Sequence, residues 1–131
     1  MYRILIVEDN ASFRKTLKSI LLSRFSSVTV DEAPDGTEAW KKISNAKPDF
    51  IFMDIQLPGD NGLVLTRKIR ESYPDMTVII LTNHDLPEYR EVANQNGAEY
   101  FLSKAATKPS EIVELVESLS HKAKETSDSE A

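Results

Sequence analysis

Carboxylate, hydroxyl and ammonium side chains stand at the ends of short apolar runs, and together they could hold a phosphoryl group. They are Glu8, Asp9, Asp54, Thr82 and Lys104. Carboxylates that lie close together repel one another unless a cation sits among them, and oxygen ligands with positions open to water suit Mg²⁺, with Mn²⁺ as the alternative. A metal, a hydroxyl, an ammonium and a carboxylate are the parts required to carry a phosphoryl group on Asp54 as an acyl phosphate.

The apolar runs predict the strands that must position these side chains. They are continuous rather than alternating, which is typical of strands covered on both faces in a parallel sheet. The four runs cover residues 4–7, 50–53, 78–81 and 100–102. Residues 28–30 alternate and predict an edge strand. Between the runs, apolar residues recur at helical spacing, for example at i, i+4, i+7 and i+8 from Phe13.

Strands that alternate with helices predict an α/β fold. We expect a single doubly wound (βα)5 domain with a parallel five-stranded sheet in the order 2-1-3-4-5, the flavodoxin-like arrangement. In such sheets the ligand lies at the carboxyl ends of the strands, where the order reverses between strands 1 and 3. Strand 1 ends in Glu8-Asp9 and strand 3 in Asp54, so the three carboxylates are predicted to share one crevice.

Composition limits the class of protein. A chain of 131 residues is the length of one domain, which we place at 1–120, followed by a polar tail at 121–131 that is frayed or begins a linker. The net charge of -5 argues against direct contact with nucleic acid, and the absence of cysteine excludes disulfides and thiolate metal sites. The sequence contains no predicted membrane span or signal peptide, so a cytoplasmic location is expected.

The chain from Met1 to about Ser120 resembles the receiver domain of bacterial response regulators in two-component signalling. The motifs that carry the resemblance follow one another at strand ends: Glu8-Asp9, Met53-Asp54-Ile55-Gln56-Leu57-Pro58 with Gly62, Leu81-Thr82, and Ser103-Lys104. Many receivers have proline after the lysine, whereas this chain has Ala105. Lys104-Ala105-Ala106-Thr107 and Leu81-Thr82-Asn83-His84-Asp85 are most similar to receivers attached to helix-turn-helix transcription regulators.

The resemblance implies a role for each acidic residue. Asp54 would accept the phosphoryl group from a sensor histidine kinase or a phosphotransfer protein. Asp9 and Asp54 would bind Mg²⁺ directly, together with the backbone carbonyl of Gln56. Glu8 would act mostly through water.

The resemblance also implies how phosphorylation is read. Thr82 and Lys104 would bind phosphoryl oxygens, and Phe101 would be the switch aromatic, although a strand aromatic is often simply part of the core. The surface of the fourth helix, fifth strand and fifth helix would then change and control a partner, an output domain or a homodimer. The chain would be a signalling receiver, not an enzyme beyond its own phosphorylation and dephosphorylation. It is either a stand-alone receiver or part of a longer regulator.

Several side chains have competing interpretations. Gln56 and His84 are predicted to flank the route of a water molecule to Asp54 and to set the phosphoryl lifetime, although a lone exposed histidine is usually inert. Gly62 is predicted to adopt a backbone conformation forbidden to other residues. The basic residues of the first helix are expected to form a solvated face. These are Arg14, Lys15 and Lys18.

Other classes of function fit these residues less well. A receiver fold that no longer uses phosphate, and serves only as a protein-interaction module, is the alternative; the intact acidic, hydroxyl and ammonium set favours the phosphorylated switch. A dehalogenase-like phosphatase requires a second aspartate two residues after the first, where this chain has Gln56. A nucleotide or flavin site requires a glycine-rich or hydroxyl-rich loop after strand 1, where this chain has acidic residues.

Overall fold

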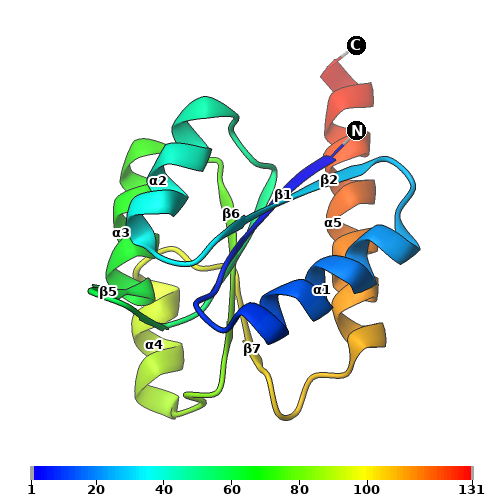
Figure 1. The fold of residues 1–131 in the computed structure, drawn as a ribbon. Coiled ribbons are helices and arrows are strands. Elements are labelled where there is room, and N and C mark those ends of the chain that lie inside the picture. The colour runs from blue at the N-terminus through cyan, green and yellow to red at the C-terminus, as the bar shows by residue number, and fades with distance from the viewer. Residues whose placement is uncertain (1, 131) are drawn as a thin grey trace.

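The central sheet of the computed structural model is parallel, and helices cover both of its faces (Figure 1). The structure describes the backbone of residues 2–130 and the side chains of residues 2–120. The sheet strands are β1 (Tyr2–Val7), β2 (Val28–Ala33), β3 (Phe50–Met53), β6 (Thr77–Thr82) and β7 (Tyr100–Ser103). They pair in the order β2-β1-β3-β6-β7. Counted along the chain, these five strands have the order 2-1-3-4-5, so the predicted topology is confirmed.

The helices form two layers. They are α1 (Ala11–Arg24), α2 (Gly36–Asn45), α3 (Gly62–Ser72), α4 (Pro87–Gln95) and α5 (Pro109–Glu130). Figure 1 shows α1 and α5 on one face of the sheet and α2, α3 and α4 on the other. The continuous apolar runs explain this arrangement, because successive residues of a strand point to opposite faces and each face must be covered.

The two faces of β1 show the alternation directly. Ile4 and Ile6 pack with Leu17 and Leu21 of α1, in the cluster that also contains the apolar side of α5. Leu5 and Val7 belong to the other cluster, with the apolar sides of α2 and α3. All of these side chains are buried. The core therefore fixes the sheet from both sides and leaves its carboxyl edge to the polar loops.

A short hairpin after β3 was not predicted. It consists of β4 (Gln56–Leu57) and β5 (Asp60–Asn61), which are antiparallel, with Gly59 at a positive φ of 70° between them. Gly62 follows with an ordinary φ, so the prediction of a forbidden conformation there is wrong. A Cβ at Gly62 would lie 1.8 Å from the backbone oxygen of Asp54. Glycine is needed at this position for close approach of the backbone.

The C-terminal segment continues α5. The helix runs to Glu130, so the backbone is helical where a frayed polar tail was expected. The side chains of 121–131 lie outside the described residues, and the domain boundary near residue 120 stays a prediction. Within the described part of the chain, no helix combines the length and apolar character needed to span a membrane.

Candidate functional site

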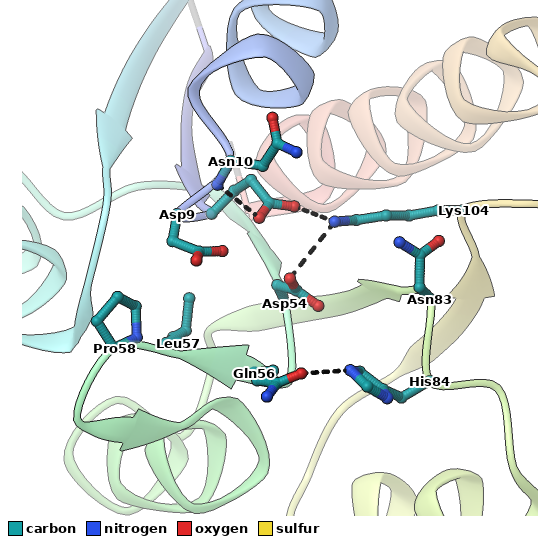
Figure 2. A pocket seen from close by; sticks show the side chains of 10 residues that line it. Asp9, Asn10, Asp54, Gln56, Leu57, Pro58, Asn83, His84 and Lys104 are labelled. Atoms are coloured by element: carbon teal, nitrogen blue, oxygen red, sulfur yellow. Dashed lines mark hydrogen bonds and ion pairs between the residues drawn. The ribbon is translucent and has the colours of Figure 1, made fainter.

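A cavity of about 390 Å³ opens at the carboxyl ends of β1, β3 and β6 (Figure 2). Its lining contains the predicted residues Glu8, Asp9, Asp54, Gln56, His84 and Lys104. Strand register brings these residues together: Val7 of β1 pairs with Met53 of β3, and the Asp54 N–H donates to the Val7 carbonyl at 3.1 Å. The residues that follow the two strands are therefore neighbours, as the topology predicts.

The three carboxylates form a compact cluster. One oxygen each from Glu8, Asp9 and Asp54 lies within 4.8 Å of the others. Glu8 and Asp54 are buried, whereas Asp9 is exposed to the cavity. Clustered carboxylate oxygens are the ligands preferred by hard divalent cations such as Mg²⁺, so this set could hold such an ion.

Glu8 is committed to other protein groups. Its Oε2 accepts a hydrogen bond from the Asn10 N–H at 3.1 Å, and its Oε1 accepts a hydrogen bond from the Lys104 ammonium. Burial raises the pKa of Glu8 above its usual value, and the hydrogen bonds from Lys104 and Asn10 offset only part of this effect. Glu8 therefore differs from Asp9, whose carboxylate faces the open cavity.

Lys104 reaches the acidic cluster although Ala105 replaces the usual proline. Its Nζ lies 3.4 Å from Asp54 Oδ2 as well as against Glu8, and its side chain is only 10% exposed. Backbone hydrogen bonds hold its loop: the Lys104 N–H donates to the Thr82 carbonyl at 2.9 Å, and the Thr107 N–H donates to the Ser103 carbonyl at 2.9 Å. Proline is thus not needed to direct this lysine into the cavity.

 The two residues predicted to act as the switch, Thr82 and Phe101, do not line the cavity. The Thr82 side chain is fully buried at the end of β6, and its Oγ1 accepts a hydrogen bond from the His84 N–H at 3.2 Å. Phe101 on β7 is half-buried and packs against the apolar cluster that contains Ala93 of α4. Thr82 thus directly precedes Asn83 and His84, which line the cavity, whereas Phe101 lies on β7 outside the lining, and the switch role of both residues stays a prediction.

Gln56 and His84, predicted separately, are in direct contact. His84 Nε2 lies 2.7 Å from Gln56 Oε1, and Figure 2 shows this pair below Asp54 at the edge of the cavity. The His84 ring also meets Tyr89 edge-on, with ring centres 6.3 Å apart. The two side chains thus form one polar bridge between the β4 strand and the loop that follows β6.

The solvated face predicted for the basic residues of α1 is found at Lys15 but not at Arg14 and Lys18, which pair with acidic groups. The Arg14 guanidinium donates to the Glu8 carbonyl at 2.8 Å and to Glu32 at 2.9 Å. Lys18 also pairs with Glu32, at 3.3 Å, whereas Lys15 is exposed. The i, i+4 spacing of Arg14 and Lys18 opposite an acidic edge strand was the available signal. These ion pairs tie the acidic turn to α1 and β2.

The comparison with protein families decides the identity. The model of the response regulator receiver domain matches residues 4–117. This chain belongs to the response regulator receiver family. The prediction made from the strand-end motifs is therefore confirmed, and the strand order of the receiver fold agrees with it.

Several receivers are similar over most of this chain. The oxygen regulatory protein NreC of Staphylococcus carnosus (strain TM300) is 39% identical over 105 residues, which cover 79% of this chain and 48% of that protein. The chain thus spans about half the length of the curated relatives it matches. NreC of Staphylococcus haemolyticus (strain JCSC1435) is 38% identical over 105 residues, with the same coverage.

Solved structures of response regulators have the same fold as this chain. The CheY-like receiver domain protein from Methanospirillum hungatei JF-1 has a TM-score of 0.85 at 29% identity, and covers 95% of this receiver and 98% of that chain. A DNA-binding response regulator of the LuxR family from Staphylococcus aureus has a TM-score of 0.83 at 25% identity, and the match covers 91% of this chain and 98% of that chain. Similarity to a DNA-binding regulator agrees with the likeness to transcription regulators predicted from the Lys104 and Thr82 motifs.

Proposed function

We propose that this receiver is a phosphorylation-dependent signalling switch in which Asp54 accepts a phosphoryl group. The observation that carries the proposal is the convergence of Asp54, the Lys104 ammonium and two further carboxylates in one solvent-open cavity. The phosphoryl donor would be a sensor histidine kinase or a phosphotransfer protein, and the reaction would take place in the cytoplasm. The catalytic work is confined to the chain's own phosphorylation and dephosphorylation.

The acidic residues divide the work. Asp54 supplies the nucleophilic oxygen, which forms the new bond to phosphorus while the bond from phosphorus to the donor breaks and the donor keeps the electron pair. Asp9, Asp54 and the Gln56 carbonyl would hold Mg²⁺, which supplies positive charge for the phosphoryl oxygens. Both oxygens of Glu8 already accept protein hydrogen bonds, and this supports a role for Glu8 through water rather than as a direct ligand.

Lys104 and Thr82 act on the phosphoryl oxygens. The Lys104 ammonium, 3.4 Å from Asp54 Oδ2, is placed to neutralise their charge. The Thr82 hydroxyl accepts the His84 N–H and still has its own proton to donate to a phosphoryl oxygen, so a shift of Thr82 toward the phosphoryl group would pull the β6–α4 loop inward with it. Space beside β7 would then be open to Phe101. This coupling converts a local charge into a different surface on α4, β7 and α5.

Phe101 is covered from outside in the unphosphorylated receiver. The Arg90 guanidinium lies 4.7 Å from the centre of the Phe101 ring and pairs with Asp85 at 2.7 Å. A dimer of this acidic chain would need basic residues opposite acidic ones, namely Arg90, Lys108 or Lys122 opposite Asp85, Glu88 or Glu111. Here Arg90 and Asp85 pair within one chain, so a homodimer that used either of them would require this pair to open.

Mass spectrometry tests the proposal directly. Incubation with acetyl phosphate and Mg²⁺ should add the mass of one phosphoryl group, and Asp54→Asn should add none. A receiver that serves as an interaction module without phosphate would gain no mass in either form. Labelling of Asp54→Asn to the wild-type extent would show that another residue is the acceptor.

A further inference from the structure

The Lys104 ammonium has a neighbour that the reaction does not account for. Two of its sides face the carboxylates of Glu8 and Asp54. A third side faces the ring of Phe13, whose centre is 4.4 Å from Nζ. A cation over an aromatic face is attracted by the ring quadrupole, and the attraction is stronger where water is excluded, as it is around this largely buried side chain.

The position of Phe13 is fixed by the start of α1. The Asn10 side chain accepts the Phe13 N–H at 3.0 Å as the N-cap of the helix. Phe13 is therefore in the first turn, half-buried, and packs against the cluster formed by α1, α5 and the inner strands. The same acidic turn that presents Asp9 to the cavity thus also places the ring beside Lys104.

A second cavity, into which the Lys104 side chain could move, also borders this residue. This cavity, of about 210 Å³, lies between α1 and α5 and is lined by Phe13, Leu17, Leu81, Lys104, Thr107 and Ile112. Lys104 lines both this apolar cavity and the polar one above Asp54. Phe13 lines the apolar cavity and not the polar one, and its ring contacts the ammonium there, where it can limit movement of the lysine away from Asp54.

We propose that Phe13 is a positioning residue for phosphorylation, holding the Lys104 ammonium over Asp54 through its ring face. The proposal rests on the proposed function of Asp54. A divalent cation among the carboxylates competes with Lys104 for Glu8 and Asp54, because both positive charges use the same oxygens. A neutral ring is not subject to that competition. The ring therefore matters most when the acidic cluster is neutralised.

Two substitutions separate the ring face from its bulk. Phe13→Leu keeps an apolar side chain and removes the π face, while Phe13→Tyr keeps both. In the unphosphorylated protein with Mg²⁺, nuclear magnetic resonance of the Lys104 ammonium should show a more mobile side chain in Phe13→Leu and wild-type order in Phe13→Tyr. Equal order in the wild type and Phe13→Leu would overturn the proposal. Phe13→Met replaces Phe13→Leu if the leucine variant fails to fold.

The second readout is the rate of phosphorylation by acetyl phosphate. Phe13→Leu should lower the rate at saturating donor by about three- to tenfold, as expected for loss of a partly desolvated cation–π contact, with little change in KM. Phe13→Tyr should remain within about twofold of the wild type on the same scale. An equal loss in both variants would assign the effect to packing and overturn the proposal.

Controls keep the two hypotheses apart. Ile20→Val trims the same α1–α5 cavity without altering an aromatic face, and should label at the wild-type rate. A loss in Ile20→Val equal to that in Phe13→Leu would contradict a specific role for the ring. If the wild type gains no phosphoryl group, the proposed function of Asp54 fails, whereas the ammonium order still decides whether Phe13 holds Lys104.

Discussion

The turn at residues 8–10 and the loop at residues 83–86 line the same end of the sheet but are held in different ways. In the turn, Glu8 is buried, its carbonyl accepts from Arg14, and Asn10 caps α1 through the Phe13 N–H. The loop is exposed throughout, and α4 begins after Leu86 with no side-chain hydrogen bond at its N-cap.

This difference matches two separate tasks. A cluster of carboxylates needs fixed geometry before a cation or an anionic donor arrives, because reorganising charged groups during the reaction is costly. A reporter of phosphorylation needs two arrangements of similar free energy. The tethered turn therefore suits the binding of a cation. The exposed loop suits a change of conformation, because its side-chain hydrogen bonds, from His84 to Gln56 and from Arg90 to Asp85, lie at the surface.

The largest expected effect distinguishes the two acidic residues of the turn. Asp9→Ala should weaken Mg²⁺ binding by more than about tenfold, because Asp9 is the carboxylate that faces the open cavity. Glu8→Ala should weaken it less, since Glu8 is already bonded to Lys104 and Asn10. Calorimetric titration measures both constants, with Asp85→Ala as a control outside the cluster. Equal losses in the two turn variants would remove the distinction.

The two helix N-termini should differ in stability. Asn10→Ala should lower the free energy of unfolding by about 1 kcal/mol through loss of the cap, whereas Leu86→Ala should have little effect because Leu86 forms no cap bond. Leu86→Asp should add a cap and slow amide exchange in α4. Urea unfolding gives the free energies. A cost for Leu86→Ala as large as that for Asn10→Ala would contradict the comparison.

The Gln56–His84 pair should set the lifetime of the phosphoryl group rather than its formation. Because the two side chains are hydrogen-bonded, either single alanine variant should open the same route for water. Each should change the decay rate by more than about twofold, equivalent to roughly 0.4 kcal/mol of barrier, and the double variant should add little more. Labelling should survive in all three. Decay within twofold in both single variants would end this hypothesis.

Sequence alone predicted the fold because its strongest signal is local. Continuous apolar runs ending in polar residues define buried parallel strands, and strand order then brings Glu8 and Asp54 together. The short hairpin after Asp54 was missed because its strands have two residues each and carry no periodicity. Gly62 was singled out correctly but for the wrong reason, since close backbone approach leaves no mark in the sequence that distinguishes it from a positive φ.

Pairings between side chains were the harder part of the site. The contact of His84 with Gln56 spans 28 positions, and its geometry depends on two loops whose conformations the pattern does not specify. Arg14 is a similar case, because its partners Glu8 and Glu32 lie in the turn after β1 and on β2. Residue types indicated which groups could do chemistry, while the tertiary packing determined which of them touch.

The smallest predicted effect on the free energy of unfolding concerns two sets of ion pairs, those of Glu32 with Arg14 and Lys18 beside the acidic turn and that of Asp85 with Arg90 in the exposed loop. Burial disfavours the charged form of Glu32, but hydrogen bonds from Arg14 and Lys18 outweigh this and hold its pKa below the usual 4.5. When folding lowers the pKa of a carboxyl group, that group stabilises the folded protein at every pH above its pKa in the unfolded chain. The stabilisation is lost as the pH falls through the lower pKa of the folded state. Glu32→Gln should thus cost about 0.5 kcal/mol at neutral pH, and the gap to the wild type should close below pH 4.5.

Asp85→Asn is the matched control, because it breaks the Asp85–Arg90 pair of the exposed loop. Arg90 also holds the pKa of Asp85 below its usual value, but water and salt screen a pair at the surface, so Asp85→Asn should change the free energy of unfolding less than Glu32→Gln does. Urea unfolding at pH 7, 5 and 3.5, values chosen to span the Glu32 titration, measures both variants. A gap for Glu32→Gln that stays constant with pH would show that packing, not charge, ties the acidic turn to β2. A pH-dependent cost for Asp85→Asn as large as that for Glu32→Gln would show that charge holds the loop at residues 83–86 as firmly as it holds the acidic turn.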